Sequence, residues 1–159
     1  MLTKEFANEL FDYSNGNLYW KKKTNTKTII GSLAGTKHSK GYWHIAIHRK
    51  QYLAHRIIFL YHHGYLPEFI DHIDGNKLNN KIENLREATK AQNLWNSKIN
   101  SNNKTGFKNV FWDKQRRKWK VIIKQNKLSH YVGCFDNLDE ANQQATQKRL
   151  LVHKNFARN

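Results

Sequence analysis

The stretch Ile70-Asp71-His72-Ile73-Asp74-Gly75-Asn76 decides how this chain folds and acts, because it sets a histidine directly after a carboxylate. Asn84 follows the histidine by 12 positions, and Asn93 follows Asn84 by 9. One imidazole, one carboxylate and amide oxygens at such spacing are the groups that a single-metal phosphodiesterase requires. We therefore take Asp71, His72, Asn84 and Asn93 as the candidate catalytic residues.

The local signals around these residues predict a strand, a loop, a second strand and a helix. Asp71 and His72 end a short apolar run, and Asp74-Gly75 and Asn79-Asn80 are turn signals, so a looped hairpin is expected. A Thr-x-x-Gln capping box that begins at Thr89 predicts a helix from residue 90. That helix carries Asn93 on its first or second turn, facing the hairpin if the two pack together.

These side chains predict a metal site and a general base. Oxygen atoms of Asp71 and Asn93 are hard ligands that suit Mg²⁺, with Mn²⁺ as the alternative. His72 suits the role of base, because an unperturbed imidazole pKa of roughly 6.5 leaves it mostly neutral at working pH. It would take a proton from the attacking water while the metal stabilises the phosphate and the leaving oxygen.

The charge of the chain points to a nucleic acid as partner. Lys and Arg outnumber Asp and Glu by 28 to 12 over 159 residues, which gives a formal charge of +16. A membrane surface is the competing polyanion, but there is no long apolar span and no signal-like start, so we expect a cytoplasmic protein without a membrane partner. The single cysteine, Cys134, excludes an internal disulfide and a multi-cysteine zinc site.

The regions on either side of the candidate site have different characters. Before it, residues 18–20 and 42–47 read as strands, and residues 52–63 read as a helix that Gly64 stops. After it, the polar, asparagine-rich residues 97–104 read as a linker. Three strand-like runs follow, and then a helix with Asn137 at its N-cap; the runs are Asn109–Trp112, Trp119–Lys124 and Leu128–Phe135.

Basic residues dominate the segment from 104 to 135, where nine Lys or Arg face one acid, Asp113. In a strand over 119–124, Lys118, Lys120 and Lys124 share one face and the apolar residues share the other. A basic sheet of this kind can lie in a DNA major groove, and the Arg116-Arg117 turn can grip phosphates. The candidate DNA-binding residues of this segment are Lys108, Lys114, Arg116, Arg117, Lys118, Lys120 and Lys124.

The central region resembles the HNH nuclease motif, the ββα-metal finger, in the His-Asn-Asn form of phage and intron-encoded homing endonucleases. The resemblance runs almost continuously from Ala54-His55-Arg56 through the hairpin to Gln92-Asn93. It implies that Asp71 and Asn93 bind the metal, that His72 is the general base, and that Asn84 pins the loop by hydrogen bonds to backbone. Many HNH enzymes carry a histidine where Asn93 stands, so the resemblance favours magnesium over zinc or nickel.

The tail is similar to the plant ethylene-response-factor (Apetala-two type) DNA-binding domain. The similarity rests on residues 105–113, on Lys118-Trp119-Lys120-Val121, on residues 131–136 and on Glu140-Ala141. Together, the two resemblances imply an α+β protein. A ββα-metal HNH unit with N-terminal β-hairpins and a helix is linked to a three-stranded antiparallel sheet packed on one helix. The predicted domains are residues 1–96, with the HNH core at about 52–96, a linker over 97–104, and the DNA-binding domain over 105–159.

We therefore expect a metal-dependent, homing-type endonuclease that acts on double-stranded DNA as a monomer, with no protein partner implied. A non-catalytic DNA-binding regulator with a retained nuclease fold is the alternative, and RNA as substrate is a third reading. Two roles stay open. Arg56 either contacts a DNA phosphate near the active site or pairs with a carboxylate, and Asp74 either approaches the metal or organises the turn beside Gly75.

Overall fold

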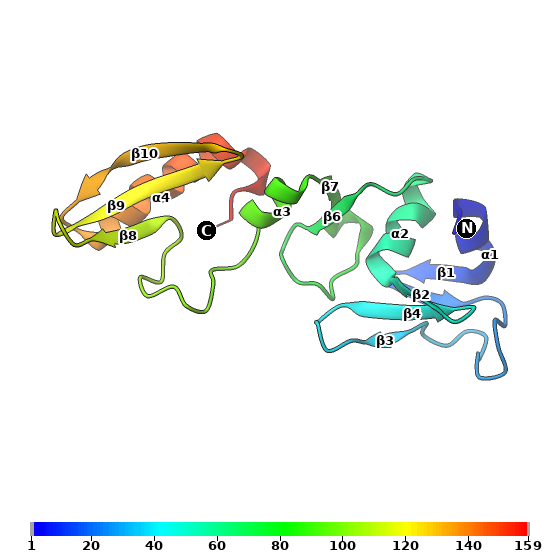
Figure 1. Cartoon of the computed structure of the whole chain (residues 1–159). Helices are drawn as coiled ribbons and strands as arrows, with labels where there is room; N and C mark the ends of the chain where they lie inside the picture. The colour runs from blue at the N-terminus through cyan, green and yellow to red at the C-terminus, as the bar shows by residue number, and fades with distance from the viewer. Residues whose placement is uncertain (1, 159) are drawn as a thin grey trace. The chain divides into compact units, whose positions relative to one another are not determined.

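The computed structural model describes residues 2–158, which form two compact units. The boundary between them along the chain falls between Ala88 and Thr89. Each unit has its own hydrophobic core. Figure 1 labels the helices and strands, and each unit is described by itself. Small antiparallel sheets and helices make up both units, so the expected α+β class is confirmed.

The first unit begins with a helix that the sequence signals did not reveal. Thr3 caps this helix by accepting a hydrogen bond from the Phe6 backbone at 3.2 Å. The helix residues Ala7 and Leu10 are buried. The elements that follow it are a two-stranded hairpin and a three-stranded sheet. Their bounds are α1 (Lys4–Leu10), β1 (Phe11–Ser14), β2 (Asn17–Trp20), β3 (Thr36–Lys37), β4 (Trp43–Ile47) and β5 (Lys50–Leu53).

The helix predicted over residues 52–63 is α2 (Ala54–His63). It starts two residues later than predicted, because Tyr52 and Leu53 pair with β4 at the end of β5. It ends at Gly64, as expected, where φ is 81° and the residue is in the left-handed conformation. Its apolar face supplies Ile57 and Ile58 to the core of the unit.

The predicted hairpin is confirmed as β6 (Phe69–His72) and β7 (Leu85–Ala88), with η1 (Ile82–Asn84) at the end of the loop. Ile70 of β6 and Leu85 of β7 belong to the same hydrophobic core as residues of the N-terminal hairpin and α2. This shared core holds β6 and β7 in place within the first unit.

The tip of the β1–β2 hairpin supports the loop of the second hairpin. The Tyr13 hydroxyl accepts a hydrogen bond from the Ile82 backbone at 3.0 Å. Gly16, with φ at 84°, lies so close that an added Cβ would stand 2.7 Å from the Lys81 backbone nitrogen. Any larger residue at position 16 would therefore displace the loop or the turn.

The second unit contains the three-stranded antiparallel sheet and the long helix that the sequence predicts. The strands lie in the order β10-β9-β8, and Figure 1 shows α4 along one face of the sheet. Val110, Val121 and Ile123 pack on Ala141 and Ala145 of that helix, and Asn137 caps it. The bounds are β8 (Val110–Asp113), β9 (Lys118–Gln125), β10 (Leu128–Phe135), α4 (Leu138–His153) and η2 (Lys154–Phe156).

The short helix α3 (Lys90–Trp95) begins at the predicted capping box and packs within this second unit. The Trp95 ring stacks on His153 at 4.4 Å and an interplanar angle of 3°. The Lys108 ammonium donates to the Trp95 carbonyl at 3.2 Å. Among residues 2–158, no helix is long and apolar enough to cross a membrane.

Candidate active site and basic sheet

Asp71 and His72 lie at the end of β6 and are almost completely buried, at 3% and 6% exposed. The register of the hairpin sets Arg86 of β7 directly opposite Asp71. Its Nε and one Nη lie 2.9 and 2.7 Å from Asp71 Oδ2. This guanidinium offsets the charge of the buried carboxylate and fixes its orientation.

A neighbour in the loop determines which tautomer of the neutral His72 ring fits the site. His72 Nε2 lies 3.0 Å from the Oδ1 atom of Asn80, which is itself buried at 4% exposed. An amide oxygen can only accept a hydrogen bond, so Nε2 must carry the proton in the neutral ring. The nitrogen that can take up a further proton is therefore Nδ1, as a general base requires.

A second histidine packs against this ring. His55, from the first turn of α2, meets His72 edge to face at 4.9 Å between ring centroids. Burial, followed by the charges of His72, Arg56 and His44, lowers the pKa of His55 to about 3. His55 is therefore uncharged at neutral pH and places no positive charge of its own beside the candidate base.

Asp74 and Asn84 hold the loop between the strands in shape. Asn84 Oδ1 accepts from the Asp74 backbone at 3.0 Å, and its Nδ2 donates to the Asn79 carbonyl at 2.8 Å and to Asp74 Oδ1 at 2.9 Å. Burial favours the neutral form of Asp74, but hydrogen bonds from Asn79, Asn76 and Asn84 outweigh it and lower its pKa. These contacts favour the turn-organising role for Asp74 over metal binding.

Asn93 lies on α3, where its backbone nitrogen donates to the Thr89 carbonyl at 3.0 Å. The helix belongs to the second unit, so the role of Asn93 as the second metal ligand stays a prediction.

The donor set fits a hard divalent cation held by few protein ligands. Within residues 2–158, no group of three or more His, Cys, Asp or Glu could hold a metal ion. Mg²⁺ commonly uses one or two carboxylates and completes its shell with water and substrate phosphate. The Asp71 carboxylate is a ligand of this type, and the binding of the same ion by Asn93 stays a prediction.

Arg56 makes a contact that neither of its two predicted roles, a DNA phosphate contact or a carboxylate pair, includes. Its guanidinium donates to the carbonyls of Pro67 and Glu68 at 3.1 and 3.2 Å, which ties α2 to the segment before β6. A DNA contact by Arg56 stays a prediction.

The basic sheet has the expected alternation. Val121 and Ile123 face α4, so Lys118, Lys120 and Lys124 lie on the opposite, open face of β9. Lys114, Arg116 and Arg117 form the exposed β8–β9 turn, in which Arg117 has φ of 53°. Surface pairs link two of these cations to acids, Lys118 to Asp136 at 3.0 Å and Arg116 to Asp113 at 3.5 Å.

Lys108 differs from the other six candidates, because it precedes β8 and its ammonium bonds to a carbonyl of α3. Burial, then the charges of Arg149 and Arg158, lower the Lys108 pKa to about 8.

Sequence reasoning did not assign roles to Asn80, Arg86 or His55. Asn80 was visible only as part of a turn signal, and its contact with His72 depends on how the loop folds back. Arg86 could have been found from strand register, since it is the residue paired with Asp71.

Comparison with known proteins gives a consistent picture. Residues 52–94 match the family described as HNH endonuclease. "Protein 3.8" of Escherichia phage T7 is 36% identical over 97 residues, which are 60% of this chain and 79% of that protein. "Uncharacterized HNH endonuclease L560" of Acanthamoeba polyphaga mimivirus is 36% identical over 92 residues, 56% of this chain and 46% of that protein.

A prophage-derived protein of Bacillus subtilis, whose name includes the words "HNH homing endonuclease", is 42% identical over 55 residues. Those residues are 33% of this chain and 32% of that protein. This chain therefore spans less than half of the length of the mimivirus and Bacillus proteins. No solved structure matches the chain significantly.

Proposed function

We propose that this chain, which belongs to the HNH endonuclease family, is a metal-dependent endonuclease that hydrolyses phosphodiester bonds in double-stranded DNA. The observation that carries the proposal is the contact between Asn80 and His72, because it directs the proton-accepting nitrogen of the imidazole away from the loop amide. The match over residues 52–94 covers His55, Asp71, His72, Asn80, Asn84, Arg86 and Asn93.

The chain's own residues account for proton transfer and orientation. His72 Nδ1 takes a proton from the attacking water, the water oxygen forms the new bond to phosphorus, and the bond to the leaving oxygen breaks. Arg86 holds the Asp71 carboxylate in place, and Asn84 keeps the loop around Asp74 in one conformation. A bound divalent metal, which we take to be Mg²⁺ with Mn²⁺ as the alternative, supplies charge stabilisation for the phosphate and the leaving group. Asp71 and Asn93 are its proposed ligands.

The second unit is the proposed DNA anchor, and its likeness to the Apetala-two type of domain stays part of this proposal. Three antiparallel strands packed on one helix leave an open face with three lysines and a basic turn. Such a face can contact phosphates on either side of the major groove, which gives affinity and register. We retain the division into a nuclease over 1–96, a linker over 97–104 and a DNA-binding domain over 105–159 as part of this proposal.

The phage and viral relatives favour a phage-type endonuclease. Our proposal is that it is of the homing type and works in the cytoplasm of a host cell, as a monomer on DNA. Incubation of supercoiled plasmid with the full chain tests the activity. Nicked or linear product should form with Mg²⁺ and should not form in EDTA. Equal cleavage in both conditions would contradict the metal dependence.

The alternative is a regulator that binds DNA without cutting it. Intact Asp71, His72 and Asn84 with their hydrogen bonds in place argue against a decayed site. A chain that binds plasmid tightly but leaves it supercoiled with both Mg²⁺ and Mn²⁺ would support the regulator.

A further inference from the structure

The second unit contains a large groove on the side of β8 and the segment before it. Its volume is about 850 Å³, which lies in the range of nucleotide- and drug-sized sites. Most residues between 97 and 109 line it, together with Asn126 and with residues of α3, β8, β9 and α4. None of the proposed catalytic residues lines this groove. Asn93 lies on α3, and other residues of that helix line it.

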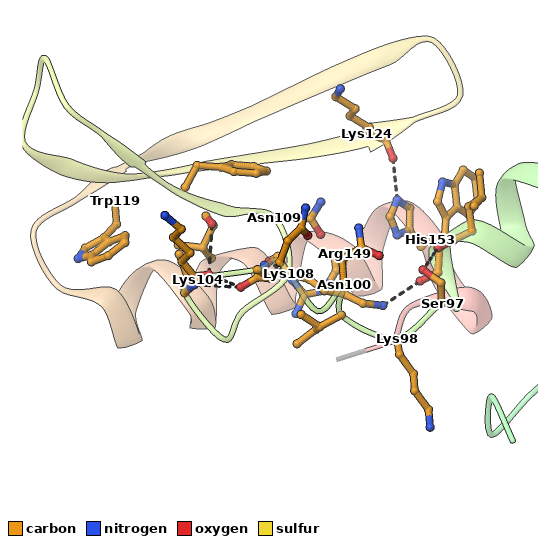
Figure 2. Close-up of a pocket in the computed structure, with 18 of the residues that line it drawn as sticks. Ser97, Lys98, Asn100, Lys104, Lys108, Asn109, Trp119, Lys124, Arg149 and His153 are labelled. Carbon is orange, nitrogen blue, oxygen red and sulfur yellow. Dashed lines mark hydrogen bonds between the residues drawn. The ribbon is translucent and has the colours of Figure 1, made fainter.

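The wall of the groove is strongly basic. Among the described residues that line it there are five Lys or Arg and no Asp or Glu. Figure 2 shows Lys104, Lys108 and Arg149 between Trp119 at one end and His153 at the other, while the side chains of Lys98 and Lys124 extend away. Of the cations among the described lining residues, Lys104 and Lys108 are therefore the ones that a ligand in the groove can reach.

The Arg149 side chain is buried at the base of the groove rather than exposed on the surface. It is only 2% exposed, and it donates to the Lys108 carbonyl at 2.7 Å and to the Thr146 hydroxyl at 2.9 Å. The charge of Arg149 also disfavours the charged form of the Lys108 ammonium. The positive charge of Lys108 would attract an anion to the groove, and a phosphodiester is the anion that this protein would meet in its proposed function.

Aromatic rings line the same groove. Trp112 is 47% exposed and meets Trp119 edge to face, at 4.7 Å and 62°. One face of Trp95 is covered by His153, so Trp112 offers the more accessible ring. Cations beside an exposed indole are the features by which proteins hold single strands: phosphates lie against the cations, and unpaired bases stack on the ring.

We propose that this groove binds unpaired nucleotides of single-stranded DNA, with a base stacked on Trp112 and phosphates against Lys104 and Lys108. A base in a duplex is stacked and paired, so this groove would act separately from the open face of β9, which is proposed for duplex DNA. The choice of DNA over another polyanion rests on the proposed function. A strand that separates near the cut would supply the unpaired nucleotides.

The test is tryptophan fluorescence titration of the full chain, in EDTA, with a twelve-residue oligothymidylate and with an abasic oligomer of equal charge. Trp112→Ala should weaken oligothymidylate binding on the order of tenfold and leave abasic binding nearly unchanged. Trp112→Phe, which keeps a stacking face, should retain most of the affinity. Lys104→Gln should weaken both oligomers and reduce the log–log salt slope by roughly 0.7.

Tyr131→Ala is the matched control, because Tyr131 is an aromatic of β10 that is 58% exposed and does not line the groove. It should leave oligothymidylate binding unchanged. The proposal is overturned if Trp112→Ala, folded by circular dichroism, binds oligothymidylate as tightly as the wild type, or if Tyr131→Ala weakens it equally. Gel shifts with duplex DNA test the proposed duplex anchor on β9 separately. If the full chain fails to bind duplex DNA but binds oligothymidylate as expected, the anchor proposal is wrong and the groove proposal is supported.

Discussion

Asp71 Oδ2 lies 2.7 Å from a guanidinium nitrogen of Arg86, its direct partner across the β6–β7 pair. The side chain of Asp71 is 4% exposed and that of Arg86 is 18% exposed, so solvent screens the pair weakly. One ion pair therefore has two effects. It orients a carboxylate at the candidate metal site, and it joins the two strands that carry Asp71 and Arg86.

Arg86→Met should lower the free energy of unfolding by about 3–5 kcal/mol, because it leaves a buried carboxylate without its cation. Urea denaturation checks this value. Lys118→Met is the matched control: its partner Asp136 is 81% exposed, and the loss there should stay below about 1 kcal/mol. Equal small losses in both variants would show that the Arg86 pair contributes little.

Asn80→Ala should lower the cleavage rate roughly 10- to 100-fold with little change in KM, since the residue orients the base and does not contact DNA in this proposal. Asn80→Asp, which keeps an acceptor oxygen, should recover part of the rate. The ¹⁵N chemical shifts of the His72 ring in the wild type should report a proton on Nε2, and Asn80→Ala should lose this preference. A ring that stays in one tautomer in Asn80→Ala would remove Asn80 from the role.

His55 should make the fold sensitive to acid. Its pKa is about 3 in the folded chain and roughly 6.5 in an unfolded one, so between these values the unfolded state binds the extra proton. The free energy of unfolding should therefore fall as pH drops below about 6.5. Between pH 7 and 4.5 the wild type should lose about 2–3 kcal/mol more than His55→Phe, which cannot titrate. Parallel losses in denaturation curves of both proteins would contradict the low pKa.

Lys120→Gln and Lys124→Gln together should weaken duplex binding and reduce the salt dependence, because each lost phosphate contact changes the log–log slope by roughly 0.9. Gel shifts at two salt concentrations measure the change. Lys50→Gln, an exposed lysine of β5 in the first unit, is the control and should leave the slope unaltered. An unaltered slope in the double variant would place the anchor elsewhere than on β9.

The sequence predicted elements best where local signals were strong. The Thr89 capping box, the Gly64 helix end and the three strands of the second unit all lie within about two residues of their predicted places. Helix α1 was missed because it is only seven residues long, and the burial of its apolar side chains depends on contacts with α2. Tertiary packing, rather than local propensity, stabilises such a short helix.

The sequence indicated candidate site residues but not the contacts that they make. The spacing from His72 to Asn84 and Asn93 pointed to the residues, and the hairpin around Asp71 and His72 is as expected. No sequence pattern reveals that Asn80 bonds to His72 or that His55 packs against it, because these contacts join a loop and a helix through the fold.

The most direct test of the proposed function compares His72→Ala with the wild type on supercoiled plasmid in Mg²⁺, with duplex affinity measured on the same preparations. The cleavage rate should fall on the order of 10²–10⁴-fold while the affinity for duplex DNA stays nearly constant, because a general base acts in the transition state. His38→Ala, which alters an exposed histidine of the same unit, should cut normally. Cleavage by His72→Ala at the wild-type rate, in a preparation free of other nucleases, would contradict the assignment of His72 as the base.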